Sequence, residues 1–333
     1  MPRPRLAMAL LLAASALPLA SCATTAPRAA AITPSGPLAV GAHEATIAGV
    51  RIWYRVAGTW DGRSAPVVFL AGGPGGNSYV FERTAGPHLE PNRLMVYYHQ
   101  RGTGRSERPA SGDYALATLA ADVEALRVHL GVPKIAIVAH SFGAVIGLEF
   151  AARFPDRLAA AILAGGLWNA PLSCREQAGR IEANHPDAYR SMIAAGPLTD
   201  DGVCERVFGA FRGAARERFN EENMFPGRAA LDELNRLEAE SGLSNTRELS
   251  GAVFRQGLLQ YRFAGAPRVT APVLVLSGAL DYAAGPRTQR ALAEALPRGR
   301  LIEYPGLGHW MFIEDPRRFA RDASAFLRSA PRN

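Results

Sequence analysis

The sequence predicts an α/β fold in which a mostly parallel sheet carries helices on both faces. Short buried apolar runs alternate along the chain with segments of helical periodicity, which is the pattern of a parallel sheet. The 333 residues are 48% hydrophobic and 20% charged, so the chain can bury at least one sizeable core. Helical segments without any strand-like run interrupt the alternation once, which predicts an inserted helical cap.

The expected elements follow in chain order. Alternating polar and apolar residues at 43–56 predict an early β-hairpin. Apolar runs predict buried strands at 66–71, 94–98, 135–139, 159–163, 272–276 and 301–304, and helical spacing predicts helices at 116–130, 142–154 and 316–327. The strands and helices assign residues 39–167 and 267–333 to the core. The interval 168–266 is the expected cap.

The N-terminus has the features of an export signal. Arg3 and Arg5 precede an apolar stretch over 6–20, which is shorter than the ~20 residues that span a bilayer. Small residues before Cys22 resemble the bacterial lipobox, so we expect a signal peptide over 1–21, cleavage before Cys22 and acylation of its thiol. The alternative is an ordinary secretory signal. Residues 22–38 are rich in Ala, Thr and Pro and are expected to form a flexible tether. The sequence therefore predicts an exported, membrane-anchored lipoprotein that faces the periplasm.

The charge of the chain does not indicate a nucleic-acid partner. The net charge is +7 and the isoelectric point is near 9.7, but Lys134 is the only lysine and the arginines are scattered among acids. No basic run with interleaved aromatic residues and no DNA-reading motif is present. A solvated basic surface explains the composition.

Two cysteines remain after the signal segment. An even pair in an exported protein predicts a possible disulfide between Cys174 and Cys204. Two buried free thiols are the alternative, because the sequence does not show how closely the two Cα atoms approach. No zinc-binding pattern accompanies them, and no metal site is expected.

The candidate nucleophile lies where a buried strand runs straight into a helix. Residues 139–143 read A-H-S-F-G, which is typical of a nucleophile elbow that holds Ser141 in a strained turn with its hydroxyl exposed. The flanks of such a turn are small because strand and helix backbones nearly touch. Gly143 meets this need, and Ala139 stands where the G-x-S-x-G pattern has its first glycine.

A serine needs a base to take its proton and a carboxylate to orient that base. Asp281 follows the predicted strand 272–276, and His309 lies in a glycine-containing loop after the last predicted strand. The order Ser, Asp, His at the carboxyl ends of strands makes Asp281 the candidate acid and His309 the candidate base.

A glycine turn at the end of strand 66–71 offers donors for an oxyanion. We expect the amides of Gly73 and Phe142 to form this site. The same loop lacks the G-K-[ST] and G-x-G-x-x-G patterns, which argues against phosphate binding. Hydrolysis by a serine, a histidine and an aspartate needs no metal or organic cofactor.

Over about residues 43–330 the sequence resembles the α/β-hydrolase fold, and within it the proline iminopeptidase family of serine peptidases. Residues 72–76, G-G-P-G-G, resemble the family's H-G-G-P-G, and 97–106, Y-Y-H-Q-R-G-T-G-R-S, resemble its D-Q-R-G-S-G-R-S. The segment D-V-E-A-L-R at 122–127 precedes the elbow in the same way. The resemblance implies a triad of Ser141, Asp281 and His309, with Arg101 as a structural residue near the site.

The family pattern is not kept everywhere. Ala71 stands for the oxyanion-loop histidine and His99 for an aspartate. Iminopeptidases hold the substrate's amino group with cap carboxylates, but the corresponding segment 255–263 contains no acid. A buried ammonium needs a carboxylate partner, which makes the cap residues Glu217, Glu221 and Glu222 candidates. A solvated helix face is their alternative role, since Arg216 and Arg218 are neighbours.

The expected activity is hydrolysis through an acyl-enzyme on a small-molecule or short-peptide substrate. An aminopeptidase of iminopeptidase type is the first expectation, and a carboxylesterase acting on small or lipid-like esters is the second. A lipid-anchored binding protein that keeps the fold without catalysis remains a third possibility.

Overall fold

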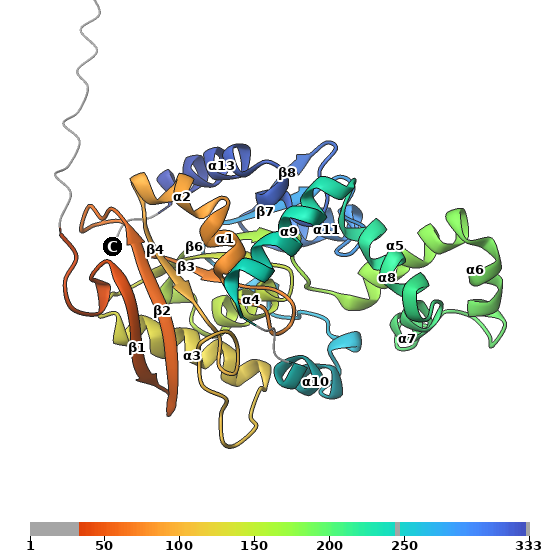
Figure 1. The fold of residues 1–333 in the computed structure, drawn as a ribbon, viewed down its shortest axis with the longest axis horizontal. Helices are drawn as coiled ribbons and strands as arrows, with labels where there is room; N and C mark the ends of the chain where they lie inside the picture. Colours follow the sequence, from red (N-terminus) through yellow and green to blue (C-terminus); the bar gives the residue numbers. More distant parts are fainter. Residues whose placement is uncertain (1–32, 244–246, 331–333) are drawn as a thin grey trace, which may run out of the picture. The chain divides into compact units, whose positions relative to one another are not determined.

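A computed structural model describes residues 33–243 and 247–330 (Figure 1). The predicted signal peptide over 1–21, the lipidation site Cys22 and most of the predicted tether lie outside the described residues. The described chain begins just before a single 3₁₀ turn, η1 (Gly36–Leu38), and the first strand follows at Gly41.

The sheet has eight strands in the order β1-β2-β4-β3-β5-β6-β7-β8. β1 pairs with β2 and β2 with β4 in antiparallel register, and the other neighbours are parallel. The central strands are continuous Val, Ile, Leu and Ala runs because both of their faces are covered. The bounds are β1 Gly41–Ile47, β2 Val50–Gly58, β3 Val67–Leu70, β4 Leu94–Tyr98, β5 Ile135–His140, β6 Leu158–Ala164, β7 Val273–Gly278 and β8 Gly299–Tyr304.

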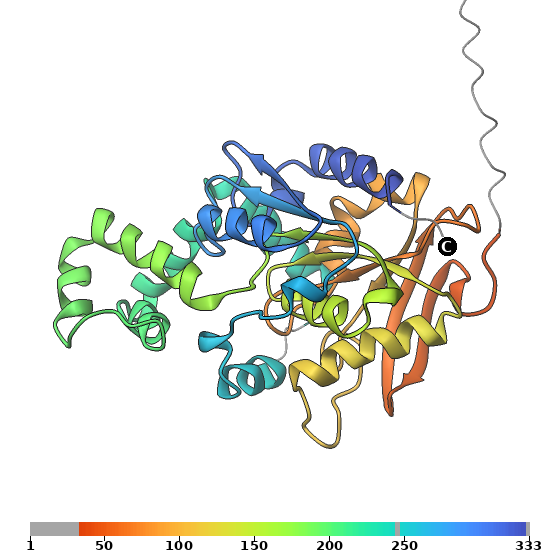
Figure 2. The ribbon, with the colours of Figure 1, turned by 180° about the vertical axis from the view of Figure 1, so that it is seen from behind.

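Helices cover both faces of this sheet (Figures 1 and 2). One core lies between the sheet and α3 (Leu116–His129), α4 (Gly143–Arg153) and α11 (Pro286–Ala295). The other core lies beneath α1 (Tyr79–Arg83), α9 (Arg228–Ser241) and the C-terminal helices α12 (Met311–Glu314) and α13 (Pro316–Arg328). This two-sided covering is the architecture that the alternating pattern predicts.

Four helices of the core were not expected from the sequence. α1, α12 and α2 (Gly86–Leu89) have only four or five residues, too few for a 3.6-residue period to be recognised. α11 is longer, but its polar face dominates the composition and Pro286 at its start reads as a turn signal.

The interval between β6 and β7 holds six α-helices among the described residues. They are α5 (Ala170–Asn184), α6 (Pro186–Ile193), α7 (Val203–Gly209), α8 (Gly213–Met224), α9 and α10 (Arg247–Arg255). An isolated bridge between Asn169 and Arg262 joins the two chain segments that connect these helices to the core. A disulfide between Cys174 and Cys204 ties α5 to α7. Over the described ranges, no helix combines the length and apolar character needed to cross a membrane.

Candidate active site

Ser141 occupies the sharp turn between β5 and α4. Its φ is +53°, a left-handed conformation that costs energy in a residue with a Cβ and that marks strained functional turns. The turn is held on both sides, since the Ser141 amide donates to Ala164 O at 3.1 Å and its carbonyl accepts from the Leu167 amide at 3.1 Å. The hydroxyl is therefore presented from a rigid backbone.

Gly143 permits this turn because the helix meets strand β3 there. A Cβ at Gly143 would stand 2.2 Å from Leu70 O, a backbone atom that cannot move aside. The methyl group of Ala139 is accommodated on the other side of the elbow, because it faces Gly147 of α4. This packing explains why alanine serves where the family pattern has glycine.

Substituting Gly143→Ala is expected to lower the free energy of unfolding by about 1–3 kcal/mol, because the added methyl overpacks the strand–helix contact. Gly147→Ala on the same helix is the matched control. Its Cβ would meet Ile137 Cγ2 at 3.5 Å and Ala139 Cβ at 3.6 Å, which are ordinary contacts. Because alanine favours a helix, the control should be neutral or stabilising. Equal destabilisation of both variants in chemical denaturation would contradict this account of the elbow.

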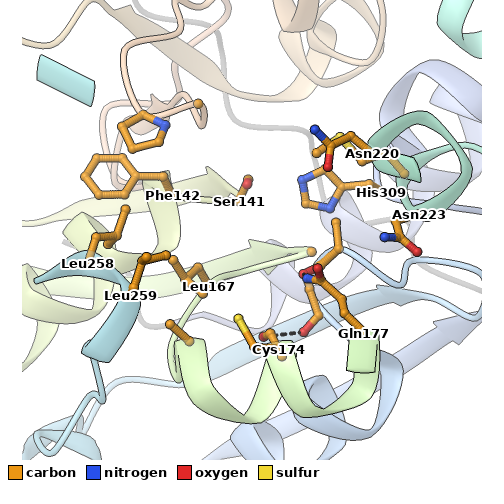
Figure 3. A pocket seen from close by; sticks show the side chains of 18 of the residues that line it. Ser141, Phe142, Leu167, Cys174, Gln177, Asn220, Asn223, Leu258, Leu259 and His309 are labelled. Carbon is orange, nitrogen blue, oxygen red and sulfur yellow. Dashed lines mark hydrogen bonds between the residues drawn. The ribbon is translucent and has the colours of Figure 1, made fainter. Parts of the chain in front are cut away.

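The structure brings Asp281 and His309 into direct contact. His309 Nδ1 lies 2.9 Å from Asp281 Oδ2, and both side chains are buried, at 4% and 0% exposure. The other carboxylate oxygen of Asp281 accepts the Ala284 amide at 3.0 Å. An ionised Asp281 requires the proton on Nδ1, which leaves Nε2 as the acceptor nitrogen. In Figure 3, the hydroxyl of Ser141 and the ring of His309 face the same cavity.

The cap contributes backbone acceptors to both loops that carry these residues. At the end of α8, the Asn223 carbonyl accepts the amides of Tyr282 and Ala283, at 2.9 and 3.2 Å. The next carbonyl, of Met224, accepts the amide of His309 at 2.8 Å. The positions of the acid loop and the base loop are thus fixed in part by the cap.

Gly73 and Phe142, the expected oxyanion donors, lie beside Ser141. Both line the cavity at Ser141, and within the described part of the chain neither amide donates a hydrogen bond. Two free N–H donors beside a serine are what a developing oxyanion requires. Gln100 supports the loop, since its Nε2 donates to Ala71 O at 2.9 Å.

The motif at 97–106 provides buried supports behind the site. Arg101 forms a two-point ion pair with Asp122 of α3, at 2.5 and 2.6 Å, which fits the structural role that the resemblance implies. His99 is buried, and burial lowers its pKa to about 3. It is therefore neutral, and its Nδ1 accepts the Arg105 amide at 2.9 Å.

Two cavities meet at the nucleophile. The first, which we call the cap cavity, has a volume of about 210 Å³ (Figure 3). It lies beneath Leu258 and Leu259, with Gln177 and Asn223 among its polar groups. None of the described residues that line it is Asp, Glu, Lys or Arg. His309 is therefore its one titratable side chain.

The second cavity, which we call the α9 cavity, has a volume of about 120 Å³. Its lining includes the aromatic residues Tyr79, Phe81, Trp310 and Phe312 and one carboxylate residue, Glu238 of α9. Four residues line both cavities: Gly73, Ser141, Met224 and His309. Met224 is the one member of this shared set that comes from the cap.

The three candidate acids of the cap do not line either cavity. Glu221 pairs with Arg228 at 3.3 Å, and Glu222 lies 3.8 Å from His185. Glu217 is exposed on α8. The expectation that one of them holds a substrate amine in the pocket is corrected by this placement, because α8 turns these side chains to solvent.

Sequence reasoning missed several residues that contact the site. Glu238 and Met224 reach it only through the folding of the cap, and no local signal marks them. Gln100 could be found from the sequence, because it lies in the motif at 97–106 that resembles the iminopeptidase pattern. Gly165 could also be found from the sequence, because it is a glycine directly after a predicted strand. Its φ is +52°, and a Cβ there would stand 2.7 Å from Asp281 Oδ2.

Comparisons with known proteins agree with this fold. The model of the alpha/beta hydrolase fold family matches residues 65–316. A protein of Klebsiella pneumoniae (strain 342) named "Putative carbamate hydrolase RutD" is 29% identical over 267 residues, which are 78% of this chain and 90% of that protein. A protein of the same name from Cronobacter turicensis is 30% identical over 263 residues, 77% of this chain and 88% of that one.

Solved structures give the same result. A proline iminopeptidase-related protein from Thermus thermophilus is similar with a TM-score of 0.71 and 26% identity, covering 86% of this chain and 96% of that chain. The esterase RhEst1 from a Rhodococcus species shares the fold with a TM-score of 0.63 and 23% identity, covering 87% and 99%. The family match, the two-sided sheet and the strand–serine–helix turn lead to one conclusion: the chain belongs to the α/β-hydrolase fold family and is a hydrolase.

Proposed function

We propose that the protein is a serine hydrolase that cleaves neutral carboxylic esters through an acyl-enzyme. The observation that carries this proposal is the placement of Ser141 and the Asp281–His309 pair at a cap cavity whose described lining has no Asp, Glu, Lys or Arg. A neutral ester needs no charged partner in its pocket. A substrate ammonium would need one, because an unpaired charge is costly to desolvate.

The steps follow from the positions of the residues. Ser141 Oγ attacks the ester carbonyl while His309 Nε2 takes the hydroxyl proton, and the Gly73 and Phe142 amides stabilise the oxyanion. The C–O bond of the ester then breaks, and the imidazolium gives its proton to the leaving alkoxide. Water then attacks the acyl-enzyme while His309 takes one of its protons, and the imidazolium returns that proton to Ser141 Oγ as the acyl–oxygen bond breaks and the carboxylic acid leaves.

The two cavities define the shape of the substrate. Because they meet at Ser141, the acyl and alcohol parts of an ester extend to opposite sides of the carbonyl, one in each cavity. An apolar cavity of about 150 Å³ is enough to hold benzene. The cap cavity, at about 210 Å³, therefore takes the larger part, which can be an aryl group, and the α9 cavity, at about 120 Å³, takes a group smaller than benzene.

The decisive experiment compares hydrolysis of a short-chain aryl ester with that of a proline aminoacyl arylamide. The RutD relatives are named as carbamate hydrolases, so an aryl carbamate completes the panel. The Ser141→Ala variant serves as blank. Serine-dependent cleavage of the ester, at a kcat/KM well above that of the arylamide, is expected. Cleavage of the arylamide as the preferred substrate would overturn the ester proposal and leave the serine mechanism in place.

An aminopeptidase is the second candidate, and Glu238 is the observation that favours it. This residue lines the α9 cavity beside Ser141, so the cavity that would receive a substrate amine has one acidic residue in its lining. If the arylamide is the better substrate, Glu238→Gln should raise its KM about tenfold or more and leave ester hydrolysis unchanged. Glu233→Gln on the same helix is the control, because Glu233 pairs with Arg236 and lines neither cavity.

The N-terminal segment supports a further part of the proposal, an anchor on the membrane through an acylated Cys22. Mass spectrometry of the membrane-extracted full chain should find a lipidated N-terminal peptide that begins at Cys22. A soluble, unmodified mature chain would contradict the anchor. A Cys22→Ala variant should move from the membrane to the soluble fraction.

A further inference from the structure

The backbone around His309 is held by partners from three other parts of the chain. Its amide donates to the Met224 carbonyl at 2.8 Å, and its carbonyl lies 3.1 Å from His140 Nε2. The amide of the preceding residue, Gly308, donates to Glu314 Oε2 at 2.8 Å. Each of these contacts links the short loop between β8 and α12 to a residue that the catalytic steps do not use.

Glu314 is the acidic member of this set, and the catalytic steps do not use it. It lies at the end of α12, a single turn that directly follows the loop, and its side chain reaches back to the start of that loop. The carboxylate therefore holds the amide that directly precedes His309.

His140 completes the support from the sheet side. A carbonyl oxygen only accepts hydrogen bonds, so His140 Nε2 carries the proton that it donates to His309 O. Burial holds the pKa of His140 well below its usual value, so this ring stays neutral. It fixes the His309 carbonyl without adding charge next to the imidazole.

We propose that Glu314 is a positioning residue for His309: by holding the Gly308 amide, its carboxylate keeps the imidazole against Asp281 and aimed at Ser141. The proposal rests on the proposed serine mechanism for its kinetic consequence. The physical reason is that a base must be held within a few tenths of an ångström of its productive position. A four-residue helix cannot supply that rigidity by its own hydrogen bonds.

Three titratable side chains face the His309 imidazole or its backbone: Asp281 after β7, His140 at the end of β5, and Glu314 on α12. Burial raises the pKa of Glu314, and the amides of Gly308 and Trp310 oppose this rise. The nearby Asp281 raises the pKa further, while His309 lowers it. A negative charge on Glu314 attracts a positive charge on the nearby imidazole.

The test compares Glu314→Ala and Glu314→Gln with Asp315→Ala in the full chain. Asp315 is the matched control because it is the next residue, and its carboxylate also accepts a backbone amide, that of Arg318 at 3.0 Å. It caps α13 and does not hold the His309 loop. Its loss should lower the midpoint of thermal unfolding without changing the kinetics.

For Glu314→Ala we expect kcat on a short-chain aryl ester to fall on the order of 10²-fold with KM changed less than about threefold. Glu314→Gln keeps an acceptor for the Gly308 amide and should recover most of kcat. Both variants remove the charge that favours imidazolium. The acid limb of the kcat/KM profile should therefore shift to lower pH in both, which a loss of stability alone would not produce.

A second readout does not depend on turnover. The proton shared by His309 Nδ1 and Asp281 should give a far-downfield resonance in the ¹H spectrum, identified by its absence in Asp281→Asn. We expect this resonance to broaden in Glu314→Ala and to persist in Asp315→Ala. If the wild-type chain proves inactive yet shows this pattern, the serine mechanism fails and the positioning role stands. Unchanged resonance, kcat and acid limb in both Glu314 variants would overturn the positioning role.

Discussion

Replacing Ser141 with alanine is expected to lower kcat for ester hydrolysis by about 10⁴-fold or more, because the variant has no nucleophile to form the acyl-enzyme. The remaining oxyanion donors and the cavity can still bind the ester, so KM should change little. The energetic cost of the strained φ of +53° at this position should not increase in the variant, since alanine is no larger than serine. The variant should therefore unfold at the wild-type temperature or slightly above it.

The measurement is the initial rate of aryl ester cleavage with matched amounts of folded wild-type and variant protein. Both proteins must be purified by the same procedure, because trace hydrolases of the host give a false residual rate. A variant rate above about 1% of wild type that co-purifies with the protein would contradict a role for Ser141 as nucleophile.

The second large effect on kcat is expected for Asp281→Asn. The asparagine is nearly isosteric and can still accept the Ala284 amide, so the loop around it should keep its shape. Its amide group, however, can donate to His309 Nδ1 and so favour the wrong tautomer, with the proton on the nitrogen that must accept the Ser141 proton. A fall in kcat of about 10⁴-fold is expected.

This effect is separable from a loss of folding. Asp322→Asn is a suitable control, because Asp322 also bonds a buried aromatic residue, Tyr304 at 3.1 Å, and lies on α13 away from both cavities. Circular dichroism should show the same helix content for the wild type and both variants. Asp281→Asn with more than about a tenth of wild-type kcat would show that the Asp281–His309 contact does not set the tautomer.

The sequence was sufficient to predict the fold and the elbow because their signals are local. A buried run such as 135–139, followed at once by serine and a small-residue helix, specifies a strand, a strained turn and an exposed hydroxyl within nine residues. Asp281 and His309 were also predictable, since each follows a recognisable strand. The fold then brings the two together at 2.9 Å, and the sequence order alone does not contain that distance.

The substrate-facing part of the site could not be predicted in the same way. Glu217 and Glu238 are both acidic residues on cap helices, and nothing near either residue shows which one faces the α9 cavity. Their difference arises from the packing of α8 and α9 against the core. The partners of the His309 loop are also set by packing, because His140 and Met224 lie 169 and 85 positions away along the chain.

The most direct test of the central claim is covalent labelling of the native chain with a fluorophosphonate, followed by peptide mass spectrometry. This probe reacts with a serine whose proton a neighbouring base can remove. A single adduct on Ser141, formed rapidly in the wild type and slowly in Asp281→Asn, is the predicted result. A folded chain that carries no adduct, or carries it on another residue, would contradict an activated Ser141 and favour a binding protein that keeps only the fold.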